Sequence, residues 1–393
     1  MADSIELDGS NLAAETRLLR ESVRAWLDEH LPVERVRELD EARSVPVELW
    51  ESLGELGVTG TLIPAEYGGA DGDIRLDYAV IQELARRYAS IAAGYMVVSM
   101  AGKCITETGN DAQRQALLPG LAAGRDLVSF GLTEPGTGTD MNGLRTSAKL
   151  VDGSWRISGQ KLYITLAADA RTILVLARTD EPADPARPSD GLSLIMTSTD
   201  QSGVEVRRLR MAGLRGAGTT EVFLDEAEAP EDAIVGERGQ GFRALVGTLN
   251  HERILQAFMA LGIAEAAWEE GRDYAIERHA FGRQIGAFQA VQHPLAESFV
   301  DLEGARLLAA KAADVEAAGR SSALEAAVAK HAAGETAVRA TDRAMRVEAG
   351  FALTEESDLM RHHRDARDMV SGPISNEMAR NLIAERCGLP RSY

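Results

Sequence analysis

The sequence feature that most constrains the fold is the hydrophobic periodicity, which changes twice along the chain. In the first third, apolar residues recur at helical spacing, for example at Leu18, Val23 and Trp26. From about residue 127 to residue 237 short β-rich runs alternate with turn residues, and from residue 241 the helical spacing resumes. A period of 3.6 indicates amphipathic helices, and evenly spaced short runs between turns indicate an antiparallel sheet. The sequence therefore predicts an α+β protein with a central antiparallel β region between two helical regions.

The length of the chain supports a division at these two changes. A chain of 393 residues exceeds what a single hydrophobic core usually accommodates. We expect three domains: an N-terminal helical domain over residues 1–126, a central β domain over residues 127–237 and a C-terminal helical domain over residues 238–393.

The charge of the chain argues against several classes of partner. The formal net charge is −19, and so acidic a surface repels nucleic-acid phosphates and anionic lipids, so we expect neither nucleic-acid nor membrane binding. No apolar run of membrane-spanning length is evident. Residues 1–17 are acidic and lack the basic and apolar regions of a secretion signal, which predicts a cytoplasmic protein.

The cysteines and histidines predict no metal site. Cys104 and Cys387 are the two cysteines, and their spacing suggests neither a metal site nor a disulfide framework. No clustered His or Cys pattern is present, and no glycine-rich dinucleotide fingerprint or P-loop follows a predicted strand.

One segment, residues 131–140, stands at the change from the helical to the β region. It reads GLTEPGTGTD, with three threonine hydroxyls and a run of turn-forming backbone. Such groups can hydrogen-bond a heteroaromatic ring or an amide of a ligand. On composition alone, an ordinary loop at a domain junction is the better explanation of the segment.

This segment and several others resemble the motifs of acyl-CoA dehydrogenases. Residues 131–140 resemble the motif TEPxAGSD, and residues 159–165 resemble GxKxWIT. The motifs keep their order and spacing from about residue 15 to residue 386. The further matches lie near the N-terminus at residues 57–69, and at residues 213–223, 239–242, 278–289 and 364–367.

The resemblance implies a specific fold and cofactor. It implies an N-terminal helical domain, a central antiparallel β domain and a C-terminal four-helix bundle, with FAD as cofactor. It also implies that four residues contact the flavin ring, with the Thr165 hydroxyl facing N5, the hydride acceptor. These residues are Leu132, Thr133, Tyr163 and Thr165. Tyr163 stands where the family usually has tryptophan, and Thr139, usually serine, is implied to touch the pantetheine arm of the substrate.

The family typically holds the dinucleotide end of FAD across a subunit contact. The resemblance implies that Arg278 pairs with the pyrophosphate, that Phe281 covers the adenine and that Gln289 adds an amide contact. Arg278 and Phe281 are three residues apart, so we expect one helical face to present both. Without the resemblance, the better interpretation is that Arg278 is a solvated charge on a helix and that Phe281 is a core side chain.

Further contacts of the dinucleotide follow from the resemblance. Ser375 and Glu377 match family positions near the FAD ribose. The family motif QxxGGxG appears here as residues 346–352, in which Gly350 is the glycine that remains and Arg346 replaces the glutamine. We expect Arg346 and Gly350 to contact the cofactor, with Arg346 supplying a positive charge.

The resemblance also implies which residue is the catalytic base. Many family members place a glutamate a few residues after the motif RDAR, but the ungapped position here is Pro373, which cannot accept a proton. Isovaleryl-CoA and long-chain acyl-CoA dehydrogenases instead place the glutamate on an earlier helix, directly before an arginine. That pair here is Glu252 and Arg253, so we expect Glu252 to be the base. We expect Asn250 and Arg253 to contact the CoA thioester.

Pro373 also removes a hydrogen-bond donor. The backbone N–H at that position usually helps to polarise the thioester carbonyl, and proline has none. Either Gly372 donates in its place or a ribityl hydroxyl of the flavin contributes more.

The resemblance implies an acyl-CoA substrate, electron-transfer flavoprotein as the electron acceptor, and a homotetramer or dimer. Two alternatives remain open. One is a related flavoenzyme that acts as an oxidase or on an acyl-carrier-protein substrate, and the other is a non-catalytic member of the family.

Overall fold

The computed structural model describes residues 14–182, 184, 187 and 189–391 of the chain. The first part of the acidic N-terminal segment discussed above lies outside the described residues. The chain divides into two compact units. The first unit comprises Met1–Glu34, Ile74–Ala89 and Arg253–Tyr393, and the second comprises Arg35–Asp73 and Ser90–Glu252.

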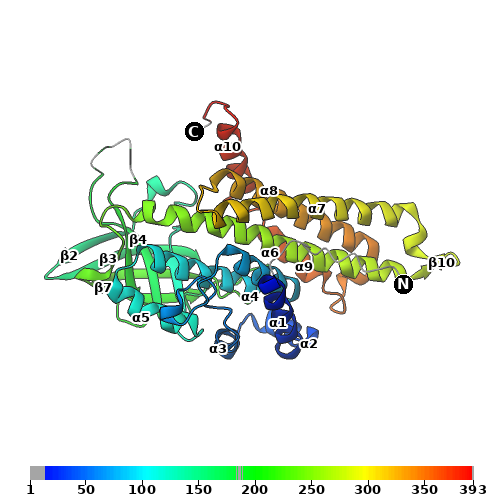
Figure 1. Ribbon diagram of the computed structural model, residues 1–393, viewed down its shortest axis with the longest axis horizontal. Coiled ribbons are helices and arrows are strands. Elements are labelled where there is room, and N and C mark those ends of the chain that lie inside the picture. The colour runs from blue at the N-terminus through cyan, green and yellow to red at the C-terminus, as the bar shows by residue number, and fades with distance from the viewer. Residues whose placement is uncertain (1–13, 183, 185–186, 188, 392–393) are drawn as a thin grey trace. The chain divides into compact units, whose positions relative to one another are not determined.

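The predicted order of helices, strands and helices is confirmed (Figure 1). Two long helices, α4 and α6, each contribute residues to both units. The helices are α1 Ala14–His30, α2 Val33–Ala42, α3 Val47–Glu55, α4 Ile74–Thr108, α5 Asp111–Ala122, α6 Gly241–Glu277, α7 Gln289–Ala317, α8 Ala323–Glu348, α9 Leu359–Asp368 and α10 Asn376–Arg386. Short 3₁₀ turns are η1 Ala65–Tyr67, η2 Met141–Gly143, η3 Glu231–Ala233, η4 Ile285–Ala287 and η5 Phe351–Leu353.

The strands of the second unit form one sheet, in the order β6-β7-β3-β2-β4-β5-β8. Most neighbours are antiparallel, as the sequence predicted, but β1 pairs with β4 in the parallel direction. A long connection through β2 and β3 separates β1 from β4, which permits this parallel pairing. The strands are β1 Val128–Gly131, β2 Ser147–Val151, β3 Ser154–Ile164, β4 Thr172–Arg178, β5 Leu192–Ser198, β6 Val204–Arg208, β7 Thr220–Pro230 and β8 Ile234–Val235.

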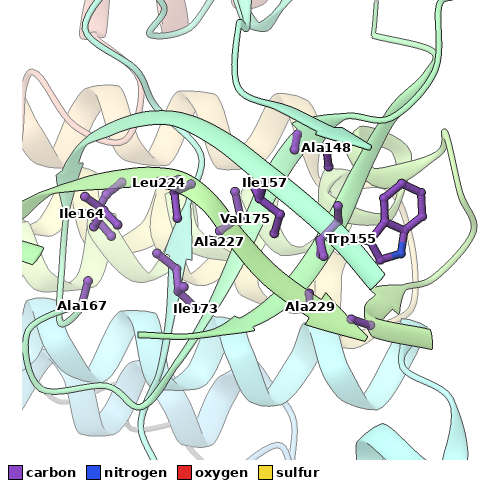
Figure 2. Close-up of a cluster of buried hydrophobic side chains, with 14 residues drawn as sticks. Ala148, Trp155, Ile157, Ile164, Ala167, Ile173, Val175, Leu224, Ala227 and Ala229 are labelled. Atoms are coloured by element: carbon purple, nitrogen blue, oxygen red, sulfur yellow. The ribbon is translucent and has the colours of Figure 1, made fainter. Parts of the chain in front are cut away.

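The core of the sheet lies between facing side chains of β3, β4 and β7 (Figure 2). Trp155 and Ile157 alternate with less buried neighbours along β3, as expected of a half-buried strand. In β4, every residue from Ile173 to Ala177 is buried, which is typical of a central strand covered on both faces. The Trp155 indole N–H donates to the carbonyl of Glu231 at 3.1 Å, so its polar atom is satisfied.

The first unit is a helical assembly in which small side chains allow close packing. Helix α8 packs against α7, α9 and α10, and its buried face consists largely of alanine. Tyr78 of α4 stacks on Phe258 of α6, with ring centroids 4.2 Å apart. In α1, the apolar spacing is confirmed for Val23 and Trp26, which are buried, whereas Leu18 is 63% exposed.

Buried charge also links the helices of the first unit. Glu83 of α4 forms an ion pair with Arg20 of α1 and accepts hydrogen bonds from Arg24, and Glu265 of α6 pairs with Arg306 of α7. Gln82 donates to both oxygens of Glu265, at 2.8 and 2.9 Å. These contacts compensate carboxylates that burial alone would destabilise.

Helix α4 meets a length and hydropathy criterion for a membrane span, although the sequence analysis expected no such run. Its most apolar window has a mean hydropathy of 1.3, and 89% of that window is buried inside the protein. Burial of this extent is the property of a core helix.

Candidate active site

The end of β1 and the end of β3 are joined by the residues predicted to contact the flavin ring. Thr133 donates its hydroxyl to the carbonyl of Leu162 at 2.6 Å, and the Leu162 N–H donates to the carbonyl of Thr133 at 3.0 Å. The proton of the Thr133 hydroxyl is therefore committed, and this hydroxyl can offer a ligand only its lone pairs. Leu132 is fixed by the ammonium of Lys161, which donates to its carbonyl at 3.2 Å.

Tyr163 is an extra residue in β3. The pairing of β3 with β7 shifts between Leu162 and Ile164, so Tyr163 forms a β-bulge, and its φ is 60°. A bulky residue in the left-handed region is an uncommon and strained conformation, which proteins retain mainly at functional sites. The bulge leaves the Tyr163 side chain 62% exposed at this end of the sheet.

Thr165 follows the bulge, and hydrogen bonds fix the backbone around it. Ser129 of β1 donates its hydroxyl to the Thr165 carbonyl at 2.6 Å, and Thr220 of β7 donates to the Ile164 carbonyl at 3.0 Å. Within the described part of the chain, the hydroxyl of Thr165 has no hydrogen-bond partner. A positioned, half-buried hydroxyl of this kind is suited to donate to a ligand atom.

A buried ion pair beneath these residues was missed by the sequence analysis. Lys161 is fully buried, and its ammonium lies 2.9 Å from the carboxylate of Glu134. Glu134 also accepts the backbone N–H groups of Arg145 and Thr146 at 2.8 and 2.9 Å. The available signal was that both residues belong to the matched motifs.

The two partners respond differently to burial. Burial lowers the pKa of Lys161 to about 8, although Glu134 opposes the shift. For Glu134, burial acts to raise the pKa, but Lys161 and the hydrogen bonds outweigh it and the pKa is lowered.

Thr139 lies in an exposed loop after these residues. Its carbonyl accepts the N–H of Met141 at 3.2 Å, which turns the chain into η2. The side chain of Thr139 is exposed, so it is accessible to a ligand.

Asn250 and Glu252 lie on α6, on either side of a fixed histidine. His251 is fully buried, and its Nε2 lies 2.8 Å from the hydroxyl of Ser99 in α4. Asn250 is 8% exposed and Glu252 is half-buried. The anchored His251 limits the movement of this helical turn, which is the property that positions a catalytic carboxylate. All these residues belong to the second unit, whereas Arg253 begins the last segment of the first unit.

The loop that carries Pro373 is held by side chains of two helices. Gln256 of α6 donates to the carbonyl of Gly372 at 2.8 Å, and Lys330 of α8 donates to the carbonyl of Ile374 at 2.6 Å. The N–H of Gly372 donates to the carbonyl of Asp368 at 3.0 Å. Gly372 therefore does not offer a free donor in place of Pro373.

The structure corrects the expected placement of Phe281. Helix α6 ends at Glu277, and Phe281 lies in the turn of a hairpin formed by β9 His279–Ala280 and β10 Arg283–Gln284. Phe281 and Gly282 have φ values of 53° and 79°, as a two-residue hairpin turn requires. Arg278 and Phe281 therefore do not share a helical face. Phe281 is 96% exposed, which also excludes a core role within this chain.

Gln289 and an aromatic pair lie close to this turn along the chain. Gln289 is the exposed first residue of α7. The Phe281 and Phe288 rings meet edge to face at 6.1 Å, and the Arg283 guanidinium lies 4.1 Å from the centroid of Phe288. This exposed surface combines aromatic faces with positive charge, which suits an adenine and a pyrophosphate.

The segment after α8 shows how the glycine motif has changed. Arg346 is exposed and pairs with Asp342 at 2.9 Å. Ala349, which replaces the first glycine, has φ 54° and ψ −122°, whereas Gly350 has the ordinary helical values of −62° and −26°. The residue that needs left-handed backbone is therefore the alanine, not the remaining glycine.

Ser375 and Glu377 lie at the start of α10. The Ser375 hydroxyl accepts the N–H of Met378 at 3.2 Å and caps the helix. Hydrogen bonds of the backbone at Glu377 and of Ser375 lower the pKa of the Glu377 carboxylate, which is exposed. The cap uses a lone pair of the Ser375 oxygen, and the hydroxyl proton is directed to the Glu377 carboxylate.

These residues have the chemistry that FAD requires. Among the described residues, the second unit offers the exposed aromatic side chain of Tyr163 and the unpaired hydroxyl of Thr165, and the first unit offers the exposed Phe281. Within the described ranges, no group of three or more His, Cys, Asp or Glu side chains could hold a metal ion.

Comparison with known families covers most of the chain. The family models described as acyl-CoA dehydrogenase N-terminal, middle and C-terminal domains match residues 13–125, 129–227 and 239–388. A probable acyl-CoA dehydrogenase of Bacillus subtilis, YngJ, is 33% identical over 378 residues, which cover 95% of this chain and 98% of that protein.

Solved structures show the same arrangement. A glutaryl-CoA dehydrogenase of Mycobacterium smegmatis in complex with FADH2 has a TM-score of 0.90 at 26% identity, covering 97% of this chain and 96% of the other. The prolyl acyl carrier protein oxidase AnaB also has a TM-score of 0.90, at 25% identity, covering 96% of this chain and all of the other.

Proposed function

Because this chain belongs to the acyl-CoA dehydrogenase family, whose members are FAD-dependent oxidoreductases acting on acyl-CoA, we propose that it desaturates an acyl-CoA thioester between its α and β carbons. In this proposal Glu252 removes the α proton, and hydride leaves the β carbon for flavin N5. The observation that carries the proposal is the half-buried carboxyl of Glu252 on α6, together with a proline at the later position.

Glu252 acts from a rigid support. The neighbouring His251 is buried against Ser99, so the helical turn is fixed before substrate binds. A base that is already aligned avoids reorganisation in the transition state. We infer that Asn250, two positions before Glu252, and Arg253, directly after it, contact the thioester.

The bound flavin supplies the N5 atom that accepts the hydride. The hydroxyl of Thr165 would donate to that atom, and Ser129 and Thr220 already fix the backbone on which this hydroxyl stands. Tyr163 covers the ring from its bulge, and Thr133 contributes lone pairs only. Leu132 completes these contacts, and Thr139 binds the pantetheine arm from its exposed loop.

The thioester carbonyl is polarised without the usual backbone donor of this loop. Pro373 has no N–H, and the N–H of Gly372 is bonded to Asp368. Loss of one oxyanion donor typically costs about 3 kcal/mol of transition-state stabilisation. Because the N–H of Gly372 is already bonded, we assign the role of the missing donor to the ribityl hydroxyl of the flavin.

The dinucleotide end of FAD is assigned to the first unit. Phe281, exposed in the turn of the hairpin, would cover the adenine. Arg278, directly before the hairpin, would pair with the pyrophosphate, and Gln289 lies eight positions after Phe281. The further proposed contacts are Arg346, Gly350, Ser375 and Glu377.

We assign the protein to the cytoplasm, with electron-transfer flavoprotein as its electron acceptor and a homotetramer or dimer as its assembly.

Anaerobic titration tests this function. The purified FAD-loaded protein is mixed under argon with short, branched, medium and long acyl-CoA thioesters, and the flavin absorbance near its visible maximum is followed. We expect at least one thioester to bleach the flavin and to yield the 2-enoyl product. Absence of bleaching by every member of a broad panel would contradict the proposal.

A second candidate follows from the likeness to AnaB, which is named as an oxidase of a carrier-protein substrate. The same titration distinguishes it. An oxidase returns the bleached flavin to its oxidised state rapidly when air is admitted, and a carrier-protein enzyme reacts with the acyl-carrier protein but not with the free CoA thioester.

A further inference from the structure

Ser357 joins two glutamates across the segment that carries the altered glycine motif. Its hydroxyl oxygen lies 2.7 Å from the carboxylate of Glu348 and 3.0 Å from that of Glu270. Glu348 is the last residue of α8, and Ser357 immediately precedes the N-cap of α9. The contact between Glu348 and Ser357 therefore connects the two residues that flank residues 349–356. We refer to Glu270, Glu348 and Ser357 as the carboxyl clasp.

The hydrogen atoms of the carboxyl clasp can be counted. A serine hydroxyl has one proton, so it can donate to one carboxylate only. The same oxygen already accepts the N–H of Leu359 at 3.2 Å, and Glu270 accepts the N–H of Asp358 at 3.0 Å. If both glutamates were ionised, Ser357 could donate its proton to only one of them. The oxygen of the other carboxylate would then face the serine oxygen with no proton between them.

The count closes when Glu348 is protonated. Glu348 then donates to the Ser357 oxygen, and Ser357 donates to Glu270. Both lone pairs of the serine oxygen and its proton are then used. The distance of 2.7 Å between Glu348 and Ser357 is typical of an O–H···O hydrogen bond.

The surroundings of Glu348 agree with this state. Its side chain is 3% exposed, and burial raises its pKa. The hydrogen bond with Ser357 opposes this shift, and the negative charges of Glu270 and Asp358 add to it, so the pKa is raised. Burial also raises the pKa of Glu270, and the hydrogen bonds from the Ser357 hydroxyl and the Asp358 backbone lower it. The negative charge of Asp358 raises it slightly, and the positive charge of Arg361 opposes that. The guanidinium of Arg361 is shared, because it also contacts Asp358 at 3.4 Å and the Arg87 carbonyl at 3.2 Å.

Other charges face Glu270 from the helices packed around it. They line one cavity of about 380 Å³ with Glu270 and carry both signs: Arg24, Asp28, Glu83, Arg86, Arg87 and Glu269. Several of these are paired with each other, as Arg24 is with Glu83 and Arg87 with Asp28. The N–H of Asp358 that Glu270 accepts favours the ionised form of Glu270, which places the proton of the carboxyl clasp on Glu348.

We propose that Glu348 is a positioning residue, which in its protonated form holds residues 349–356 through Ser357 and thereby makes the order of this segment depend on pH. The consequence for FAD rests on the proposed function, because Gly350 lies in this segment and Arg346 precedes it. The order of the segment itself does not depend on that assignment.

The direction of the pH dependence follows from the raised pKa of Glu348. An acid whose pKa is higher in the folded than in the unfolded chain stabilises the fold below its ordinary pKa of 4.5 and loses that contribution as the pH rises through the folded value. We therefore expect residues 349–356 to be well protected at low pH and to loosen as the pH increases above 4.5.

Amide hydrogen exchange of the apoprotein tests the carboxyl clasp without the cofactor. Between about pH 5 and about pH 8, after correction for intrinsic exchange, we expect protection of residues 349–356 to fall by up to about tenfold for each pH unit within the titration range. In Glu348→Gln the amide donates to Ser357 as the protonated acid does. This variant should keep the low-pH protection at every pH.

Two variants complete the test. Glu355→Gln removes an exposed carboxyl of the same segment and should keep the pH dependence of the natural protein. Ser357→Ala removes the shared atom and should give low protection at all pH values. Persistence of the natural pH dependence in Glu348→Gln, or its loss in Glu355→Gln, would overturn the proposal.

A second measurement separates this inference from the assignment of the cofactor site. The affinity for FAD, measured by flavin fluorescence, should decrease with rising pH in the natural protein but not in Glu348→Gln. If exchange behaves as expected while FAD affinity is independent of pH in both proteins, the clasp stands and its link to the cofactor is wrong. If the protein binds no FAD at any pH, the proposed function fails and the exchange result stands alone.

Discussion

Ala349 occupies a backbone conformation that side chains other than glycine rarely adopt. Its φ of 54° and ψ of −122° follow directly from the end of α8. Conformations of this kind cost on the order of 1–3 kcal/mol, and the surrounding structure must offset that cost. Here the carboxyl clasp on the next segment is one of the contacts that can do so.

Ala349→Gly should therefore stabilise the protein. We expect the free energy of unfolding to increase by about 1 kcal/mol, because glycine relieves more strain in the folded state than it adds entropy to the unfolded state. Urea denaturation of the apoprotein measures the change. Ala310→Gly, within the regular backbone of α7, should instead lower stability by about 1 kcal/mol; equal effects of the two changes would contradict this explanation.

The pair of Lys161 and Glu134 is the second feature that belongs to single residues. Removal of one member of a buried pair leaves the other charge without its partner. We expect Lys161→Met to lower the free energy of unfolding by about 3 kcal/mol, measured by urea denaturation. Arg156 lies on the same strand as Lys161 and forms an exposed ion pair with Glu228 of β7. Arg156→Met should therefore lower the free energy of unfolding by less than about 1 kcal/mol.

A double variant separates the two contributions of this pair. Lys161→Met combined with Glu134→Gln should lose less stability than the sum of the single changes, because neither buried charge remains. Additive losses would show that the two residues stabilise the protein independently. Local sequence patterns could not predict this pair, although both residues belong to the matched motifs. Lys161 and Glu134 are distant in sequence and meet only when the sheet forms.

At the scale of elements, the sequence predicted the helices and most strands, but not the local irregularities that expose side chains. Periodicity identified β3, yet nothing in the run around Tyr163 signals a bulge, because bulge positions with positive φ usually hold glycine. The hairpin after α6 does have a turn signal in its sequence. Phe281 and Gly282 separate two short strands, and a glycine at the second position of such a turn is common.

Phe281→Ala tests the role of this hairpin. Because Phe281 is 96% exposed, the change should alter the free energy of unfolding of the apoprotein by less than about 0.5 kcal/mol. If the ring covers the adenine, the FAD dissociation constant, measured by flavin fluorescence, should increase by at least about tenfold. Leu18→Ala, an exposed apolar residue on α1, serves as the control and should leave FAD binding unchanged; an unaffected dissociation constant in Phe281→Ala would remove this residue from the cofactor site.

At the scale of the whole molecule, two changes of periodicity were sufficient to predict the order of helical and β regions. The sequence could not predict that the compact units divide within α4 and α6, because a long helix shows no break in its pattern where its contacts change. The position of Glu252 on α6 came from the family resemblance rather than from any local pattern. The acyl chain of the substrate stays open, since side chains from several elements determine the depth of such a pocket.

The proposed assembly of several subunits belongs to this scale. Helix α7 exposes Val300 and Leu307, which are 69% and 71% exposed and lie seven residues apart, so they share one face. We expect native mass spectrometry to show a dimer or tetramer. Leu307→Glu should shift the distribution towards smaller species and weaken FAD retention, whereas Leu18→Glu should not. A monomer that retains FAD tightly would contradict the assembly.

Reduction of the flavin by substrate in the Glu252→Gln variant tests the central claim most directly. The variant is loaded with FAD and mixed under argon with the acyl-CoA that bleaches the natural protein fastest, and flavin absorbance is followed by stopped flow. Loss of a general base costs roughly 10²–10⁴-fold in rate, so we expect yellow, FAD-bound protein that bleaches at least about a hundredfold more slowly. Glu51→Gln, an exposed glutamate on α3, should bleach at the natural rate, and bleaching of Glu252→Gln at that same rate would contradict the assignment of Glu252 as the base.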